Sequence, residues 1–141
     1  MKSREGLIRL KRFHVDEKRR QVAQIEAMIA EFERMAKELD DQINAEQERS
    51  GIRDAGHFAY PTFAKAAMQR RDNLRASAAE LKGQLDGAKG ECDEAIAELT
   101  KLEALAERDQ ERERDAEESR QMGGGEPPPA RPLRSAAALA R

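Results

Sequence analysis

Residues 8–46 read IRLKRFHVDEKRRQVAQIEAMIAEFERMAKELDDQINAE and repeat their apolar side chains every seven positions. One series consists of Ile8, Val15, Val22, Ile29, Ala36 and Ile43. A companion series follows three positions later and consists of Lys11, Lys18, Ile25, Phe32, Leu39 and Glu46. This spacing is that of the a and d positions of a coiled coil, and the residues between them favour helix. The pattern predicts one long helix over about residues 5–49.

A second heptad pattern begins after residue 59. Its first series is Tyr60, Ala67, Leu74, Leu81, Ala88, Ala95 and Leu102, and its second is Ala64, Arg71, Ala78, Leu85, Cys92, Leu99 and Ala106. Between the two patterns, residues 50–57 contain Gly51 and Gly56 and have no regular period, which is typical of a turn. We expect a second helix over about residues 59–120, with Pro61 in its first turn, where proline is tolerated.

Two helices joined by a short turn fold back against each other. The predicted fold class is therefore all-α, an antiparallel two-helix coiled-coil hairpin over residues 1–120. With the turn centred near Asp54, residue i is expected to face roughly residue 108 − i. The second helix then extends beyond the start of the first. Its sequence there, ERDQERERDAEE at 107–118, has no apolar stripe, so we expect it to fray or to await a partner.

Residues 121–141 form a Gly/Pro-rich tail. Three glycines at 123–125 end the helix, and three prolines at 127–129 prevent it from restarting. The remaining residues are of low complexity, which predicts a disordered C-terminal tail.

The composition excludes several classes of protein. Of 141 residues, 38 % are charged, 4 % are aromatic and none is Trp, which is too little bulk for a globular core. No run of about 18 apolar residues is present, so we expect no direct membrane insertion. The formal net charge of −2 argues against a nucleic-acid partner. The single cysteine cannot form an internal disulfide, which fits a reducing cytosol.

No constellation of residues suggests catalysis. The glycines at 123–125 lack the context of a phosphate-binding loop. His14, His57 and Cys92 do not have the spacing of a zinc site, and Cys92 falls on a heptad position. The chain is therefore predicted not to be an enzyme and to bind no cofactor and no metal.

Three surface features suggest partner binding, each with a simpler alternative. A stripe beside the heptad series, flanked by Arg9, Arg12, Arg19 and Arg20, consists of Leu7, Leu10, Phe13 and His14. Lys11 and Lys18 in the heptad series weaken the pairing there. The stripe is either a docking surface or a frayed helix end. The aromatic residues Phe58, Tyr60 and Phe63 either anchor a partner or pack the turn. Gly83, Gly87 and Gly90 either form a groove for another helix or mark a bend.

The hairpin layout, the basic start and the segment FAYPTFAKAAMQRRDNL at 58–74 resemble the flagellar export protein FliJ family. The resemblance implies a stalk that links the export ATPase ring to the export-gate membrane protein and assists export chaperones. It implies a cytoplasmic protein, peripherally associated with the inner membrane through the export apparatus. The ring would be met by the paired termini, with Leu7, Arg9, Leu10, Lys11, Arg12 and Phe13. The gate would be met by Tyr60, Phe63 and Ala67.

Three other functions stay open at this point. The first is the equivalent stalk of a virulence-type secretion system, which gene neighbourhood would distinguish. The second is a nucleic-acid-binding coiled coil that uses the basic N-terminus, whose affinity would depend on salt. The third is a structural, homo-oligomeric coiled-coil adaptor, in which the alanine and leucine series would pair across chains.

Overall fold

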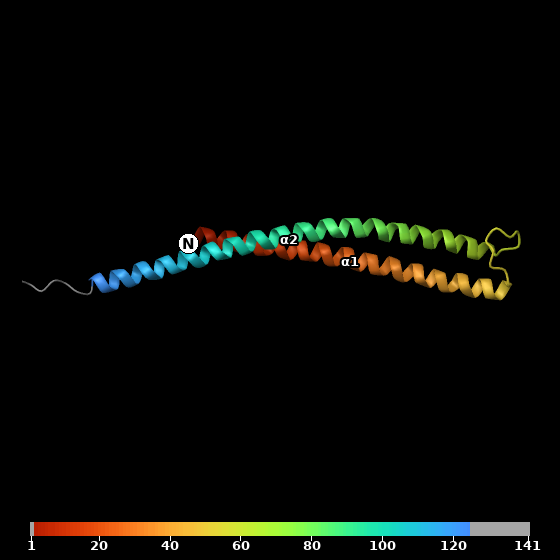
Figure 1. Ribbon diagram of the computed structural model, residues 1–141, viewed down its shortest axis with the longest axis horizontal. Coiled ribbons are helices and arrows are strands. Elements are labelled where there is room, and N and C mark those ends of the chain that lie inside the picture. The colour runs from red at the N-terminus through yellow and green to blue at the C-terminus, as the bar shows by residue number, and fades with distance from the viewer. Residues whose placement is uncertain (1, 125–141) are drawn as a thin grey trace, which may run out of the picture.

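The computed structural model describes residues 2–124 as two long helices, α1 (Lys2–Ser50) and α2 (Thr62–Gly124). They run antiparallel and side by side as a long, thin hairpin (Figure 1). Within these residues the structure is helical apart from the connection at 51–61. The predicted all-α hairpin is therefore confirmed. The tail prediction falls largely on residues 125–141, which lie outside the described part of the chain.

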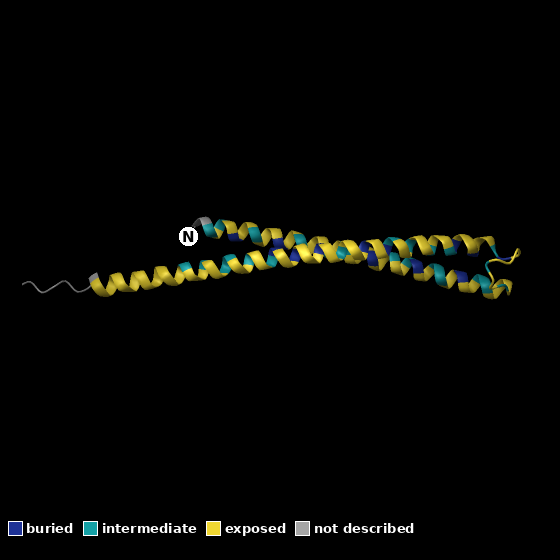
Figure 2. Ribbon diagram, turned by 45° about the horizontal axis from the view of Figure 1, so that its top comes forward, coloured by how far each residue is buried: buried dark blue, intermediate teal, exposed yellow. Residues whose placement is uncertain are grey.

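The contact between the helices, here called the seam, follows the heptad pattern. All predicted a and d positions on both helices are buried or half-buried. The buried residues of α1 are mostly β-branched, and those of α2 are mostly alanine; the buried set is Ile8, Val15, Ile29, Ala36, Ile43, Ala64, Ala67, Ala78, Leu81, Ala88, Cys92 and Ala95. Figure 2 shows these buried positions where the two helices meet. Bulky side chains on one helix thus pack against small ones on the other.

Charged residues at seam positions pair across the two helices. Lys11 Nζ lies 2.9 Å from Glu98 Oε2, and Lys18 Nζ lies 3.7 Å from Glu91 Oε2. Both lysine side chains are only partly exposed, at 31 % for Lys11 and 20 % for Lys18. Each lysine finds a carboxylate on α2, and the expectation that the two lysines weaken the pairing stays a prediction.

A similar arrangement occurs towards the loop. Arg71 occupies a seam position, and its Nη1 lies 2.8 Å from Asp40 Oδ1. Arg75 binds the other carboxylate oxygen of Asp40. One acidic side chain on α1 therefore holds two arginines from successive turns of α2.

The register differs from the prediction. The expected pairing places residue 18 opposite residue 90 and residue 4 opposite residue 104. Lys18 does pair with Glu91, but Arg4 reaches Asp109. The reason is the connection, which runs over 51–61 and is centred on Gly56 rather than on Asp54. This moves the facing residue by about four positions, or one helical turn.

The connecting loop is held by local hydrogen bonds. α1 ends at Ser50, and the next residue, Gly51, has a φ of 77°, in the left-handed region that glycine adopts without a steric penalty. The backbone N–H of Gly56 donates to Asp54 Oδ1 at 2.9 Å, and that of Tyr60 donates to the His57 carbonyl at 3.0 Å. The Pro61 carbonyl then accepts the first bond of α2 from Lys65 N at 3.1 Å.

The second helix begins later and ends later than predicted. It starts at Thr62 rather than near residue 59, because Pro61 disfavours the helical conformation of the residue before it. It continues to Gly124, so the end of α2 beyond the start of α1 is helical rather than frayed. Residues 111–123 are exposed along this unpaired end (Figure 2). Neither described helix holds a stretch apolar enough to cross a bilayer.

Candidate partner-binding surfaces

The end of the hairpin opposite the loop, here called the open end, exposes large apolar side chains. The exposed fractions are 41 % for Leu7, 61 % for Leu10 and 56 % for Phe13. All three lie on α1, outside the seam that Ile8 and Val15 enter. The prediction of an exposed apolar stripe is therefore confirmed, while its role in binding a partner stays a prediction.

Leu105 of α2 extends this stripe onto the second helix. Leu7 shares a face of α1 with Arg4 and Lys11, three and four residues away. Arg4 is ion-paired with Asp109, and its Nη1 also donates to the Leu105 carbonyl at 3.3 Å. Leu105 shares a face of α2 with Asp109, four residues on. Leu7 and Leu105 thus lie on the same side of the hairpin, and together with Leu10 they form the leucine patch.

Sequence reasoning missed Leu105 because it lies outside both heptad series of α2. Its exposed fraction is 36 %, the smallest among the large exposed apolar residues. The register observed between the two helices would have identified Leu105, because this register places residue 105 opposite Leu7. Residues of both helices form the leucine patch, so the heptad pattern of one helix alone does not predict it.

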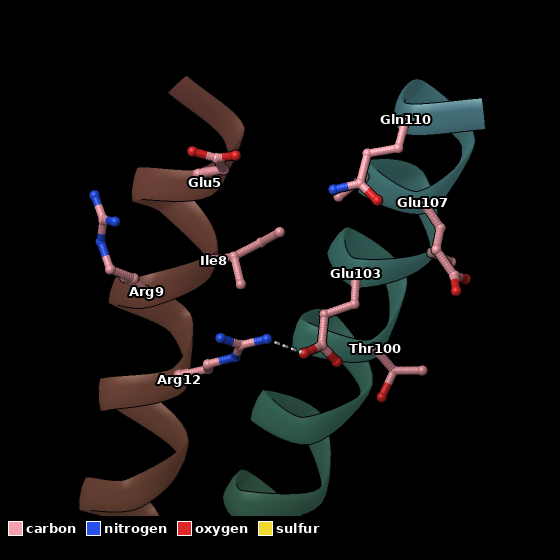
Figure 3. Close-up of a pocket in the computed structure, with 10 residues that line it drawn as sticks. Glu5, Ile8, Arg9, Arg12, Thr100, Glu103, Glu107 and Gln110 are labelled. Carbon is pink, nitrogen blue, oxygen red and sulfur yellow. Dashed lines mark hydrogen bonds and ion pairs between the residues drawn. The ribbon is translucent and has the colours of Figure 1, made fainter. Parts of the chain in front are cut away.

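Arg9 and Arg12 lie on the other side of the open end. A groove of about 730 Å³ runs between the helices there and is lined by Glu5, Ile8, Arg9, Arg12, Thr100, Glu103, Ala104, Ala106, Glu107 and Gln110. Figure 3 shows Ile8 pointing from α1 towards α2, and Arg12 reaching across, with its Nη2 2.9 Å from Glu103 Oε2. Arg9 points away from α2 in the same view. We call this surface the open-end groove.

The leucine patch and the open-end groove are separate surfaces. At 100° per residue, Leu10 and Arg12 lie about 160° apart around α1. Phe13 falls between Leu10 and Arg9 on the outward face. The prediction of one apolar stripe bordered by arginines therefore holds for Phe13 and Arg9, which lie about 40° apart around α1, and is corrected for Leu10 and Arg12, which lie on opposite flanks of the hairpin.

The charges of the open end are partly neutralised within the molecule. Lys11 donates to Glu98 Oε2 at 2.9 Å, and this hydrogen bond lowers the pKa of the Glu98 carboxyl, with further contributions from the charges of Lys11 and His14. Arg12 is engaged by Glu103. Among the described residues, no carboxylate lies within ion-pair distance of Arg9, so Arg9 is the most available cation of the predicted set.

The loop end presents two exposed aromatic side chains. Phe58 is 95 % exposed and its ring stacks on that of His57 at a centroid distance of 4.8 Å. Phe63, in the first turn of α2, is 55 % exposed. These two rings are the apolar surface that the loop end offers.

Tyr60 and Ala67 have a different place from the one predicted for a gate-binding patch. Both are buried in the seam, at 6 % and 5 % exposure. The Tyr60 hydroxyl accepts a hydrogen bond from Gln47 Nε2 at 2.8 Å and donates to Met68 Sδ at 3.4 Å. Tyr60 thus packs the turn, and of the three predicted residues only Phe63 presents its side chain to the outside.

The remaining candidates have simple surroundings. Gly83, Gly87 and Gly90 lie within an unbroken helix, and a Cβ added at any of them would meet nothing within 4 Å. Cys92 is free and buried in the seam. Within residues 2–124, no three His, Cys, Asp or Glu side chains gather in a way that could hold a metal ion.

Comparison of the chain with protein-family models, with curated proteins and with solved structures finds no match. The functional argument therefore depends on the two ends of the rod and on the surfaces that each presents.

Proposed function

We propose that this chain is a stalk-like adaptor of the flagellar type III protein export apparatus. In this role it links the export ATPase ring to the export-gate membrane protein and assists the cycling of export chaperones. The observation that carries the proposal is the separation of two unlike surfaces by a stiff hairpin. The 49 residues of α1 give a rod of about 74 Å at 1.5 Å per residue.

The open end is assigned to the ATPase ring. It presents the leucine patch and Phe13, which supply apolar contact area, and Arg9, which is free to meet a carboxylate of the ring. Lys11 and Arg12 would first have to leave Glu98 and Glu103. Exposed ion pairs of this kind contribute little to stability, so a ring carboxylate can compete for them.

The loop end is assigned to the export gate. Phe58 and Phe63 are the exposed aromatic side chains there, and aromatic anchors contribute a large share of the energy of protein interfaces. The local hydrogen bonds of the loop hold its backbone before any partner arrives, which reduces the entropy lost on binding. Tyr60 and Ala67 are buried in the seam and are not part of this surface.

Two charge-matched variants test the assignment of the open end. The double variant Arg9→Glu/Arg12→Glu should abolish stimulation of the export ATPase, because both cations of the groove become anions. The control Lys37→Glu/Lys89→Glu makes the same charge change on exposed positions away from either end of the hairpin. Equal loss of stimulation in both variants, or no loss in either, would refute the assignment of this end.

Two truncations test the loop end. Phe63→Ala should weaken capture of the export gate by about tenfold, the effect of removing a single interface residue worth 1–2 kcal/mol. Met28→Ala removes an apolar side chain of similar exposure, 46 %, from the middle of the rod and should leave capture unchanged. If Phe63→Ala leaves both gate capture and ATPase stimulation at the level of the unchanged protein, the loop end is not the gate surface.

A further inference from the structure

The leucine patch leaves three large apolar side chains uncovered at one end of the molecule. Leu7, Leu10 and Leu105 are 41 %, 61 % and 36 % exposed, on two helices that meet at this end. Phe13 is also exposed at this end. Each square ångström of such surface removed from water contributes about 25 cal/mol, so a cover for the patch would be favoured.

The chain that follows α2 has the length needed to return to this patch. Asp109 pairs with Arg4 near the start of α1, and α2 ends at Gly124. The unpaired part of α2 therefore spans about 22 Å at 1.5 Å per residue. Glycines at 123–125 permit a reversal of the chain. Residues 126–132, EPPPARP, then reach about 22 Å at the 3.1 Å per residue of a proline-rich segment.

The segment that would arrive there has a matching pattern. Residues 133–141 read LRSAAALAR. Apolar residues occur at the helical spacing i, i+3, i+4 and i+7, namely Leu133, Ala136, Ala137 and Ala140. Three of these four are alanines, which allow a helix to lie close to another helix. The tail from 130 onwards carries three arginines and no acidic residue, whereas residues 111–118 of α2 carry five acidic and two basic ones.

We propose that residues 133–141 of the same chain cover the leucine patch. The tail returns along the acidic, unpaired end of α2 and lays Leu133 and its alanine neighbours against Leu7, Leu10 and Leu105. Tethering through a short linker raises the effective concentration of the segment to the millimolar range, so a weak contact suffices. A partner that uses the leucine patch must first displace the tail. This inference stands whether or not that partner is an ATPase ring.

Paramagnetic relaxation in the full chain tests the contact. A nitroxide is attached at Ser135→Cys in a Cys92→Ala background, and the methyl signals of leucine and isoleucine are recorded. The signals of Leu7, Leu10 and Leu105 should lose more than half of their intensity, while that of Ile43, close to the loop, should keep its own. Equal broadening at Ile43, or none at the patch, would overturn the proposal.

Two neighbouring substitutions provide the matched control. Ala137→Asp places a charge on the face predicted to meet the patch and should restore the lost intensity. Ala138→Asp places the same charge about 100° further round and should leave the broadening in place. A mixed sample, with the nitroxide on chains that carry no isotope label, detects contact between molecules. Broadening of equal size in that sample would assign the patch to a second copy and refute the intramolecular cover.

Discussion

Small side chains on α2 set how closely the two helices approach. Ala64 has no exposed surface, and Ala67, Ala78, Ala88 and Ala95 are also buried against the β-branched residues of α1. Protein interiors are packed as densely as organic crystals, so a buried methyl group has no spare room beside it. The seam therefore depends on the absence of bulk at these positions as much as on the presence of Ile and Val opposite.

Enlarging a buried alanine should destabilise the hairpin. Ala64→Leu forces additional methylene groups into the seam and is expected to lower the free energy of unfolding by about 1–3 kcal/mol. Ala66→Leu makes the same change at an exposed position two residues away and should alter it by no more than about 0.5 kcal/mol. Urea unfolding of both variants measures the difference. Equal stability of the two would mean that the seam has room for a leucine.

The ion pair of Lys11 with Glu98 makes a testable contribution to the pH dependence of stability. The pKa of Glu98 is lowered in the folded state, chiefly by its hydrogen bond from Lys11. The resulting stabilisation is present above the unfolded pKa of the carboxyl and is lost as the pH falls through the folded one. Lys11→Met should raise the pKa of Glu98 towards its ordinary value, as followed by carboxyl carbon NMR. Lys101→Met, on an exposed position of α2, should leave it unchanged.

Single residues show which features of the hairpin could be predicted from the sequence and which could not. Positions such as Val15 and Ala95 could be assigned to the seam because a seven-residue period is a local property of one helix. Leu105 could not be assigned to the leucine patch, because its neighbour Leu7 lies on the other helix. Ala67 was assigned to a binding surface from resemblance, although its heptad position places it in the seam. The heptad period of each helix was thus enough to predict the buried seam. The exposed surfaces could be predicted only with the register between the two helices.

Three glycines make α2 less stable than alanines at the same positions would. Gly83, Gly87 and Gly90 are helical, and open space surrounds the position of a Cβ at each. Glycine in a helix is less favourable than alanine by about 0.5–1 kcal/mol because it loses more backbone entropy on folding. Nothing in the packing of the hairpin offsets this difference.

Replacing these glycines should therefore stabilise the protein. The triple variant Gly83→Ala/Gly87→Ala/Gly90→Ala is expected to raise the free energy of unfolding by about 1.5–3 kcal/mol. Gly51→Ala should have the opposite sign and lower it by about 1 kcal/mol, since alanine at a φ of 77° is strained. Chemical denaturation measures both. A destabilised triple variant would mean that these glycines bend the helix or admit another chain.

The start of α2 shows why the ends of helices are harder to predict than their middles. The heptad series begins at Tyr60, and the period alone extends the helix to that residue. Tyr60 keeps its seam position but lies outside the helix, because Pro61 restricts the backbone before it and a turn from His57 takes up its N–H. The heptad period predicts which residues are buried. It does not predict whether a buried residue at the end of the pattern is also helical.

At the scale of the whole molecule, the hairpin is paired over part of α2 only. A chain that ends at Gly124 and one that ends at Gln110 should unfold within about 0.5 kcal/mol of each other, since residues 111–123 are exposed throughout. A chain that ends at Ala95 loses half-buried Leu99 and Leu102 and should be less stable by several kcal/mol, roughly 1–2 for each leucine. Thermal unfolding compares the three. A large loss on shortening to Gln110 would show that the unpaired end of α2 contributes to folding.

Two helices lying side by side have a cross-section about twice as wide as it is thick. A beam of this shape resists flexing within the plane of its two members far more than flexing out of that plane, in the manner of a flat ruler. Past the start of α1 only a single helix continues, and there the preference for one direction disappears. A load applied at that slender tip would therefore be absorbed first by local curvature of the single helix.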